Sequence, residues 1–135
     1  MNGGCFCGSI RYELLSKPED VYYCHCRDCQ ILSGSAFHVL GIIKSESIRI
    51  ISGEPARYAH RTASGSEMTR EFCPECGTPL FLKSTRFSEI KMFTVSSLEE
   101  PDSVKPSFEI WSASRASWSK IDGELKSFPH DALDG

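Results

Sequence analysis

The stretch Cys73-Pro74-Glu75-Cys76-Gly77 decides the fold, because a C-x-x-C knuckle supplies half of a tetrahedral zinc site and needs its other half from elsewhere in the chain. Two cysteines three residues apart at a tight turn point both sulfurs at one ion, and Gly77 supplies a left-handed backbone. The second pair is Cys5 and Cys7, since residues i and i+2 of a strand share a face. The predicted structural zinc site on Cys5, Cys7, Cys73 and Cys76 ties the N-terminal strand to the middle of the chain.

The remaining three cysteines lie in Cys24-His25-Cys26-Arg27-Asp28-Cys29. So short a segment can hold one ion without distant help, but it supplies no fourth ligand. His25 has the opposite side-chain direction from its neighbours, and Asp28 is better placed to bond a backbone amide or a neighbouring strand. The fourth position is left to water, to a substrate thiol, or to one of the distant histidines His38, His60 and His130.

Catalytic zinc usually keeps three protein ligands and one open position, so the triplet Cys24, Cys26 and Cys29 is predicted to hold a catalytic zinc. Two zinc ions per chain are therefore expected. A zinc ion on three thiolates is soft and suits binding another sulfur, which favours thiol chemistry over hydrolysis. Disulfides are the weaker interpretation, because seven cysteines cannot all pair and a bridge from Cys5 to Cys7 would close a strained ring.

The spacing of apolar residues and turn signals predicts an all-β fold with little helix. At 135 residues the length favours one domain. The one helical candidate is a turn or two over residues 27–32. The predicted strands cover residues 9–14, 21–24, 36–43, 47–51, 56–61, 68–72, 79–83 and 90–95.

Charge and hydropathy exclude several partners. A net charge of −3 argues against nucleic-acid binding, which needs an excess of Lys and Arg on one face. No apolar stretch approaches the length of a membrane span, and the N-terminus has neither the basic nor the apolar region of a signal peptide. A cytoplasmic protein is expected, and in a reducing compartment clustered cysteines indicate metal ligands.

Four segments resemble the glutathione-dependent formaldehyde-activating enzyme / centromere protein V family. They are residues 3–12, with Gly3-Gly4-Cys5-Phe6-Cys7-Gly8; Cys24-His25-Cys26-Arg27-Asp28-Cys29-Gln30; Ser33-Gly34-Ser35-Ala36-Phe37; and residues 72–81, with Phe72-Cys73-Pro74-Glu75-Cys76-Gly77. The resemblance implies a β-tent of layered antiparallel sheets stapled by zinc. It also implies a structural zinc on the first and third cysteine clusters and a catalytic zinc on the triplet.

The activity implied by the resemblance is a carbon–sulfur lyase that adds glutathione to formaldehyde, giving S-hydroxymethylglutathione. A small thiol such as glutathione and an aldehyde are the expected partners, while the oligomeric state stays open. One alternative is a non-catalytic zinc-binding adaptor, which a fourth protein ligand on the triplet would favour. Another is methionine sulfoxide reductase B, on a related β-tent, which needs a free catalytic cysteine that this assignment does not leave.

The domain is expected to cover residues 1–128, and residues 129–135 are expected to form a frayed tail.

Several other residues are candidates for a role in the site, and each has a purely structural role as its alternative. Glu109 stands where the family often has histidine, and it is an acid/base candidate near an aromatic pocket. The further candidates are Phe37, Phe81, Trp111 and Trp118 for pocket or core, Arg27, Arg61 and Arg70 for glutathione carboxylates or surface, Ser33 and Ser35 for a thiolate or a turn, and His38 for a satisfied core histidine.

Overall fold

The protein is built mainly of short strands, as the sequence predicts. The computed structural model describes residues 1–121 and 125–132. Within that part of the chain there is one α-helix, α1 (Arg27–Ser33). The strands are β1 (Asn2–Gly4), β2 (Arg11–Leu14), β3 (Asp20–Cys24), β4 (His38–Lys44), β5 (Ile48–Ser52), β6 (Ala56–Arg61), β7 (Glu67–Phe72), β8 (Pro79–Ser84), β9 (Ile90–Thr94), β10 (Phe108–Ile110) and β11 (Lys126–Ser127).

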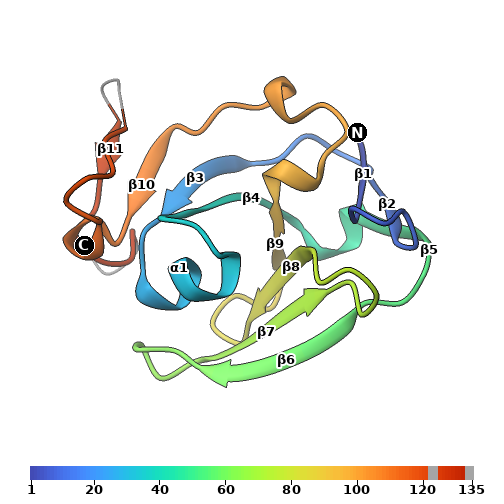
Figure 1. The fold of residues 1–135 in the computed structure, drawn as a ribbon, viewed down its shortest axis with the longest axis horizontal. Coiled ribbons are helices and arrows are strands. Elements are labelled where there is room, and N and C mark those ends of the chain that lie inside the picture. Colours follow the sequence, from blue (N-terminus) through green and yellow to red (C-terminus); the bar gives the residue numbers. More distant parts are fainter. Residues whose placement is uncertain (122–124, 133–135) are drawn as a thin grey trace.

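The strands form two sheets. A three-stranded sheet has the order β1-β2-β5, and an eight-stranded sheet has the order β11-β10-β3-β4-β9-β8-β7-β6. Figure 1 shows the small sheet beside the N-terminus, and β10 and β11 at the opposite end of the molecule near the C-terminus. The pairings are antiparallel except that β10 lies parallel to both β3 and β11. The expected all-β fold of layered sheets is confirmed.

Each of the eight predicted strands overlaps an observed one, and α1 covers the predicted helical segment. The N-terminal strand expected to carry Cys5 and Cys7 is wrong in position: β1 ends at Gly4, and Cys5 and Cys7 lie in a turn closed by a hydrogen bond from the amide of Gly8 to the carbonyl of Cys5. The positions of β1, β10 and β11 were not predicted. These strands are two or three residues long, and β10 and β11 pair with partners far away in the sequence, so local alternation carries no signal for them. In the described residues, no helix has the length and apolar character needed to cross a membrane.

Side-chain alternation along the large sheet divides the core into two clusters. On β8, Phe81 belongs to the cluster under the small sheet, whereas Leu82 belongs to a cluster on the other face. On β9, Phe93 and Met92 divide in the same way. Successive side chains of a strand point to opposite faces, so both faces of these strands are covered.

Tyr12 of β2 fixes the small sheet to the large one. Its side chain is fully buried and meets the ring of Phe81 edge-to-face, with 5.0 Å between the ring centroids. Its hydroxyl lies 2.6 Å from the hydroxyl of Ser97, so the buried polar atom is satisfied. A single β-bridge between Gly3 and Leu98 adds a backbone connection.

The expected frayed tail, residues 129–135, lies partly outside the described residues, which end at Ala132. In its described part, the carbonyl of Pro129 accepts a hydrogen bond from the amide of Ala113, at 3.2 Å. The carbonyl of His130 accepts one from the amide of Trp111, at 3.0 Å. These two bonds hold the segment beside the end of β10, while the domain limits stay a prediction.

The pairing of β4 with β9 gives a test of this packing. Gly41 lies opposite Phe93, and a Cβ atom at Gly41 would overlap the Phe93 ring. We expect Gly41→Ala to lower the free energy of unfolding by about 1–3 kcal/mol, measured by urea denaturation, because the core would be overpacked. Adding Phe93→Leu should recover part of this loss. Strictly additive effects of the two substitutions would contradict the proposed contact.

Candidate functional site

The first and third cysteine clusters meet, as predicted. Cys5 and Cys7 follow β1, and Cys73 and Cys76 lie in the turn between β7 and β8. All four Sγ atoms lie within 4.8 Å of one another. The Sγ atoms of Cys7 and Cys73 are 3.8 Å apart although the residues are 66 positions apart in the chain. This group can hold one metal ion.

Backbone amides and two hydroxyl groups surround these sulfurs. The amides of Glu75 and Cys76 donate to Cys73 Sγ, each at 3.4 Å, and Gly77 has the positive φ of 80° that the knuckle predicts. Two polar neighbours were not predicted. The Ser9 hydroxyl lies 3.3 Å from Cys73 Sγ, and the Thr78 hydroxyl lies 3.1 Å from Cys76 Sγ. Since hydrogen bonds to a thiolate stabilise its charged form, the surroundings suit a set of thiolate ligands.

The triplet forms a second cluster. Cys24 ends β3, Cys26 is the N-cap of α1, and Cys29 lies in the first turn of α1. Their Sγ atoms also lie within 4.8 Å of one another. Cys26 Sγ accepts a hydrogen bond from the amide of Cys29, at 3.3 Å, so one sulfur both caps the helix and belongs to the cluster. Within residues 1–121 and 125–132, no histidine or carboxylate joins this group.

The thiols of the triplet differ in their pKa values. Hydrogen bonds from Cys24 and Cys29 lower the pKa of the Cys26 thiol to about 2. Hydrogen bonds with Cys26 and Cys29, together with burial, raise the pKa of Cys24 well above its ordinary value. Three thiolates this close repel one another unless a cation lies among them, and tetrahedral sulfur sites are typical of zinc. The donor set of each cluster therefore fits a divalent, sulfur-binding metal.

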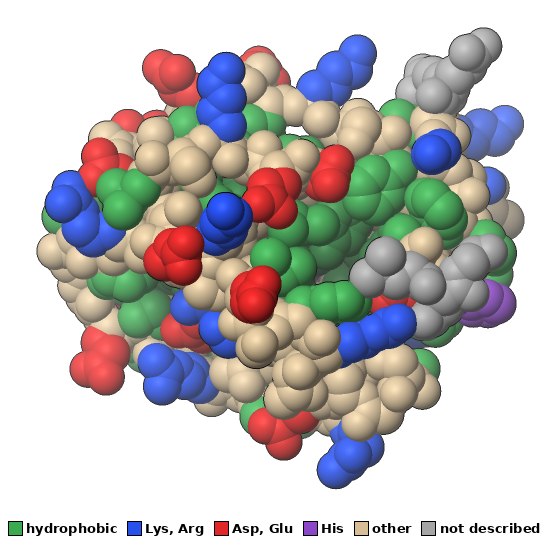
Figure 2. Space-filling model, turned by 180° about the vertical axis from the view of Figure 1, so that it is seen from behind, with side chains coloured by type: hydrophobic (Ala, Val, Ile, Leu, Met, Phe, Trp, Pro, Cys, Tyr) green, Lys and Arg blue, Asp and Glu red, His purple; other side chains and the backbone are tan. Residues whose placement is uncertain are grey.

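A cavity of about 540 Å³ opens beside the triplet, and Cys24, Cys26 and Cys29 all line it. Its walls are mostly apolar. Figure 2 shows hydrophobic side chains gathered in a hollow with acidic and basic side chains around its edge. The other lining residues are Asp20, Tyr22, Arg27, Asp28, Leu40, Ile42, Thr62, Ala63, Ser64, Ser66, Met68, Arg70, Leu82, Ser84, Arg86, Phe87, Ile90, Met92, Phe108, Ile110, Trp111, Ser114, Asp131 and Ala132.

Of the four aromatic candidates, Trp111 alone lines this cavity. Phe81 is fully buried in the core under the small sheet, and Phe37 packs edge-to-face on the ring of Tyr23. Trp118 is 77% exposed and belongs to neither the core nor the cavity. Tyr22 and Phe108 were missed, although their rings stack in the wall with centroids 5.1 Å apart. Alternation places Phe108 on the same side of β10 as Ile110.

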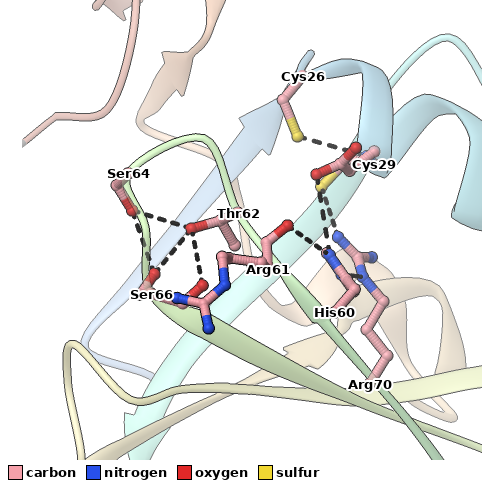
Figure 3. Close-up of polar contacts among 9 residues, drawn as sticks. Cys26, Cys29, His60, Arg61, Thr62, Ser64, Ser66 and Arg70 are labelled. Atoms are coloured by element: carbon pink, nitrogen blue, oxygen red, sulfur yellow. Dashed lines mark hydrogen bonds and ion pairs between the residues drawn. The ribbon is translucent and has the colours of Figure 1, made fainter.

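Of the three candidate arginines, Arg70 of β7 is the one whose side chain reaches the triplet. It is buried, lines the cavity, and lies with Nη2 3.7 Å from Cys29 Sγ. Its Nε donates to Nε2 of His60, at 2.9 Å, and Nδ1 of His60 lies 4.0 Å from a carboxylate oxygen of Asp28. Figure 3 shows the side chains of Arg70 and His60 pointing toward Cys29. Among the described residues, no carboxylate forms an ion pair with Arg70, so its positive charge faces the sulfurs and the cavity.

The other predicted polar residues differ in position. Arg27 lines the exposed edge of the cavity, whereas Arg61 lies outside it and donates to the carbonyl of Gly65. Ser33 and Ser35 do not line the cavity. The Ser35 amide instead bonds the carbonyl of Gln30 at the end of α1, which agrees with the turn interpretation.

The predicted position of Glu109 beside the pocket is wrong. Its neighbours on β10 line the cavity, so alternation turns Glu109 to the other side of the strand. There it accepts a hydrogen bond from Arg115, at 2.7 Å, and lies 3.8 Å from Nε2 of His25. The side chain of His25 is fully buried and does not join the cysteine group, which agrees with its predicted direction, and desolvation lowers its pKa.

None of the three histidines considered as a fourth ligand joins the triplet. His38 is buried, and its Nε2 lies 3.0 Å from the Thr94 hydroxyl, which agrees with a satisfied core histidine on that side of the ring. Burial, followed by the charge of Arg70, lowers its pKa to about 4, so it is neutral at pH 7. His60 is bonded to Arg70, and His130 packs edge-to-face on Trp111, with 5.1 Å between the ring centroids.

The sequence of the chain is similar to those of two curated proteins. An uncharacterized lyase of Schizosaccharomyces pombe is 28% identical over 83 residues, which cover 62% of this chain and 57% of that protein. A putative glutathione-dependent formaldehyde-activating enzyme of Colletotrichum graminicola is 28% identical over 83 residues, covering 55% of this chain and 42% of that protein. The chain thus spans about half the length of these curated relatives.

A crystal structure of a Rhodobacter sphaeroides protein has the same fold, with a TM-score of 0.58 and 22% sequence identity over 78% of this chain and 92% of that one. The family model described as glutathione-dependent formaldehyde-activating enzyme matches residues 1–114, a range that contains both cysteine clusters. This chain therefore belongs to the glutathione-dependent formaldehyde-activating enzyme family.

Proposed function

We propose that this protein is a zinc-dependent carbon–sulfur lyase that forms and splits adducts of a small thiol and an aldehyde, of the S-hydroxymethylglutathione type. The observation that carries the proposal is the position of Cys24, Cys26 and Cys29 on the wall of a cavity, with no fourth protein ligand among the described residues. Membership of the family supports glutathione as the thiol and formaldehyde as an aldehyde. For a non-catalytic adaptor we would instead expect a closed metal site with no cavity beside it.

The two cysteine clusters would hold one zinc each. Cys5, Cys7, Cys73 and Cys76 would hold a structural zinc, and Cys24, Cys26 and Cys29 would hold the catalytic one. When bound to three thiolates, zinc supplies a position that binds a further sulfur in its thiolate form at neutral pH. Both sites would belong to a single domain over residues 1–128. Thiolates survive in a reducing compartment, so we expect the protein in the cytoplasm.

The residues of the chain would hold the two reactants together. The apolar walls exclude water and place the carbonyl carbon beside the thiol, so a reaction between two molecules becomes one within a single complex. A carbon–sulfur bond forms while the π electrons of the carbonyl move to its oxygen, which takes up the proton lost by the thiol. In the reverse direction the same bond breaks. Arg70 lies on the cavity wall next to Cys29, where its guanidinium would donate to the oxygen as it gains charge.

Metal content separates the roles of the two clusters. We expect two zinc ions per chain by native mass spectrometry. Cys26→Ser should retain one zinc and the fold while thiol–aldehyde exchange, followed by NMR, is abolished. Cys73→Ser should give unfolded or insoluble protein, because the metal link between the two sheets is lost. Full activity of Cys26→Ser would refute the catalytic site, and a soluble, compact Cys73→Ser variant would refute the structural one.

Arg70 offers a second test. We expect Arg70→Met to lower kcat by about 10²–10³-fold with both zinc ions retained, because a donor to the developing oxyanion is lost. Arg70→Lys should recover part of the rate, since the charge remains but the fork-shaped donor does not. The matched control is Arg61→Met, because Arg61 is on the neighbouring strand but outside the cavity. Equal kcat values for Arg70→Met and Arg61→Met would show that Arg70 has no such role.

A further inference from the structure

The cavity beside the triplet is much larger than formaldehyde needs. Its volume is about 540 Å³. Formaldehyde has two heavy atoms and takes up about as much space as one or two water molecules, each about 30 Å³ in the liquid. Cavities of about 300–1,000 Å³ are typical of sites that enclose a drug-sized ligand. A larger part of the substrate than this one-carbon aldehyde must therefore fill the space.

The walls of the cavity suit an apolar group. Tyr22 and Phe108 stack with an interplanar angle of 10°, and Trp111 extends this aromatic wall beyond β10. Met68 and Met92 line the cavity from β7 and β9. Thioether and aromatic side chains make favourable contacts with apolar and aromatic groups, and Met adapts its shape to them.

Glutathione does not match these walls. It carries two carboxylates, an amino group and two amides, and burying such groups without partners is unfavourable. The charged side chains that line the cavity are mostly at its solvent-exposed edge, among them Asp20, Arg27 and Arg86, whereas Arg70 is buried beside Cys29. The peptide part of a thiol therefore suits the edge, and the apolar interior is left for the other reactant.

We propose that the carbonyl substrate is an aldehyde with an aryl or alkyl group of several carbons, which lies against Tyr22, Phe108 and Met92. This inference rests on the proposed function, because it names the substrate class of the same site. The thiol sulfur forms a bond to the carbonyl carbon, the π electrons move to the oxygen, and the oxygen takes the thiol proton. The product is a thiohemiacetal, and neither an oxidant nor a reductant is needed.

Binding of an aldehyde analogue can be measured without turnover by NMR. The three methionines of the chain serve as probes, because two line the cavity and one does not. Met68 and Met92 line the cavity, whereas Met1 is at the N-terminus and does not. In the metal-loaded full chain labelled with ¹³C-methyl methionine, 2-phenylethanol, an unreactive analogue of phenylacetaldehyde, should shift the Met68 and Met92 signals saturably and leave Met1 unchanged. Absent shifts, or equal shifts at all three methionines, would overturn the inference.

Two variants narrow the cavity. Ile42 and Ile90 line it and are half-buried, so Ile42→Phe and Ile90→Phe should each weaken binding of 2-phenylethanol by about tenfold or more. Ile51→Phe is the matched control, because Ile51 is 56% exposed and lies outside the cavity. Unchanged binding in both cavity variants would overturn the inference.

Kinetics separate this inference from the proposed function. With glutathione as the thiol, we expect kcat/KM for phenylacetaldehyde to exceed that for formaldehyde by about tenfold or more. Ile42→Phe should lower the value for phenylacetaldehyde by a much larger factor than the value for formaldehyde, whereas Ile51→Phe, outside the cavity, should leave both values nearly unchanged. Turnover of formaldehyde without phenylacetaldehyde would refute the inference and leave the proposed function intact. Turnover of neither aldehyde would refute both.

Discussion

The contact on which the rest of the structure depends is the meeting of Cys5 and Cys7 with Cys73 and Cys76. It brings the small N-terminal sheet onto one face of the large sheet, where Tyr12 packs on Phe81. A cross-connection between such distant parts of the chain removes more freedom from the unfolded chain than a local one. Because the small sheet covers one face only, the other face is left to α1 and the cavity.

Alternation along the strands then decides what each face can do. Neighbouring residues of β8 and β9 supply the closed core on one side and the cavity wall on the other. On β10, Phe108 and Ile110 line the cavity, while Glu109 bonds Arg115 behind it. The rule that separates core from cavity is therefore the two-residue period of the strand. Residue type does not separate them, since apolar side chains line both.

The parts of the site that are local in sequence could be predicted, and those that depend on tertiary placement could not. Cysteine spacing predicts both clusters, because ligands within six residues or in a C-x-x-C turn already converge. The cavity depends on β10, whose parallel pairing with β3 joins distant segments and leaves no local signal. For the same reason sequence could not distinguish buried Arg70 from Arg61, or Trp111 from Phe81. The choice between Arg70 and Arg61 depends on which face of the large sheet is covered, whereas Trp111 lies just beyond the end of β10, where no strand pattern applies.

The two clusters have the same kind of donor, so their difference must come from number and surroundings. Four thiolates around a dication leave two net negative charges, which the amides of Glu75 and Cys76 help to stabilise. Three thiolates leave one negative charge, and Arg70 lies 3.7 Å from Cys29 with no carboxylate partner among the described residues to offset it. With a dication bound, the triplet and Arg70 together would therefore be close to neutral. Under the proposed function, the site would accept one more anionic sulfur from the cavity at a lower electrostatic cost than the four-thiolate site would.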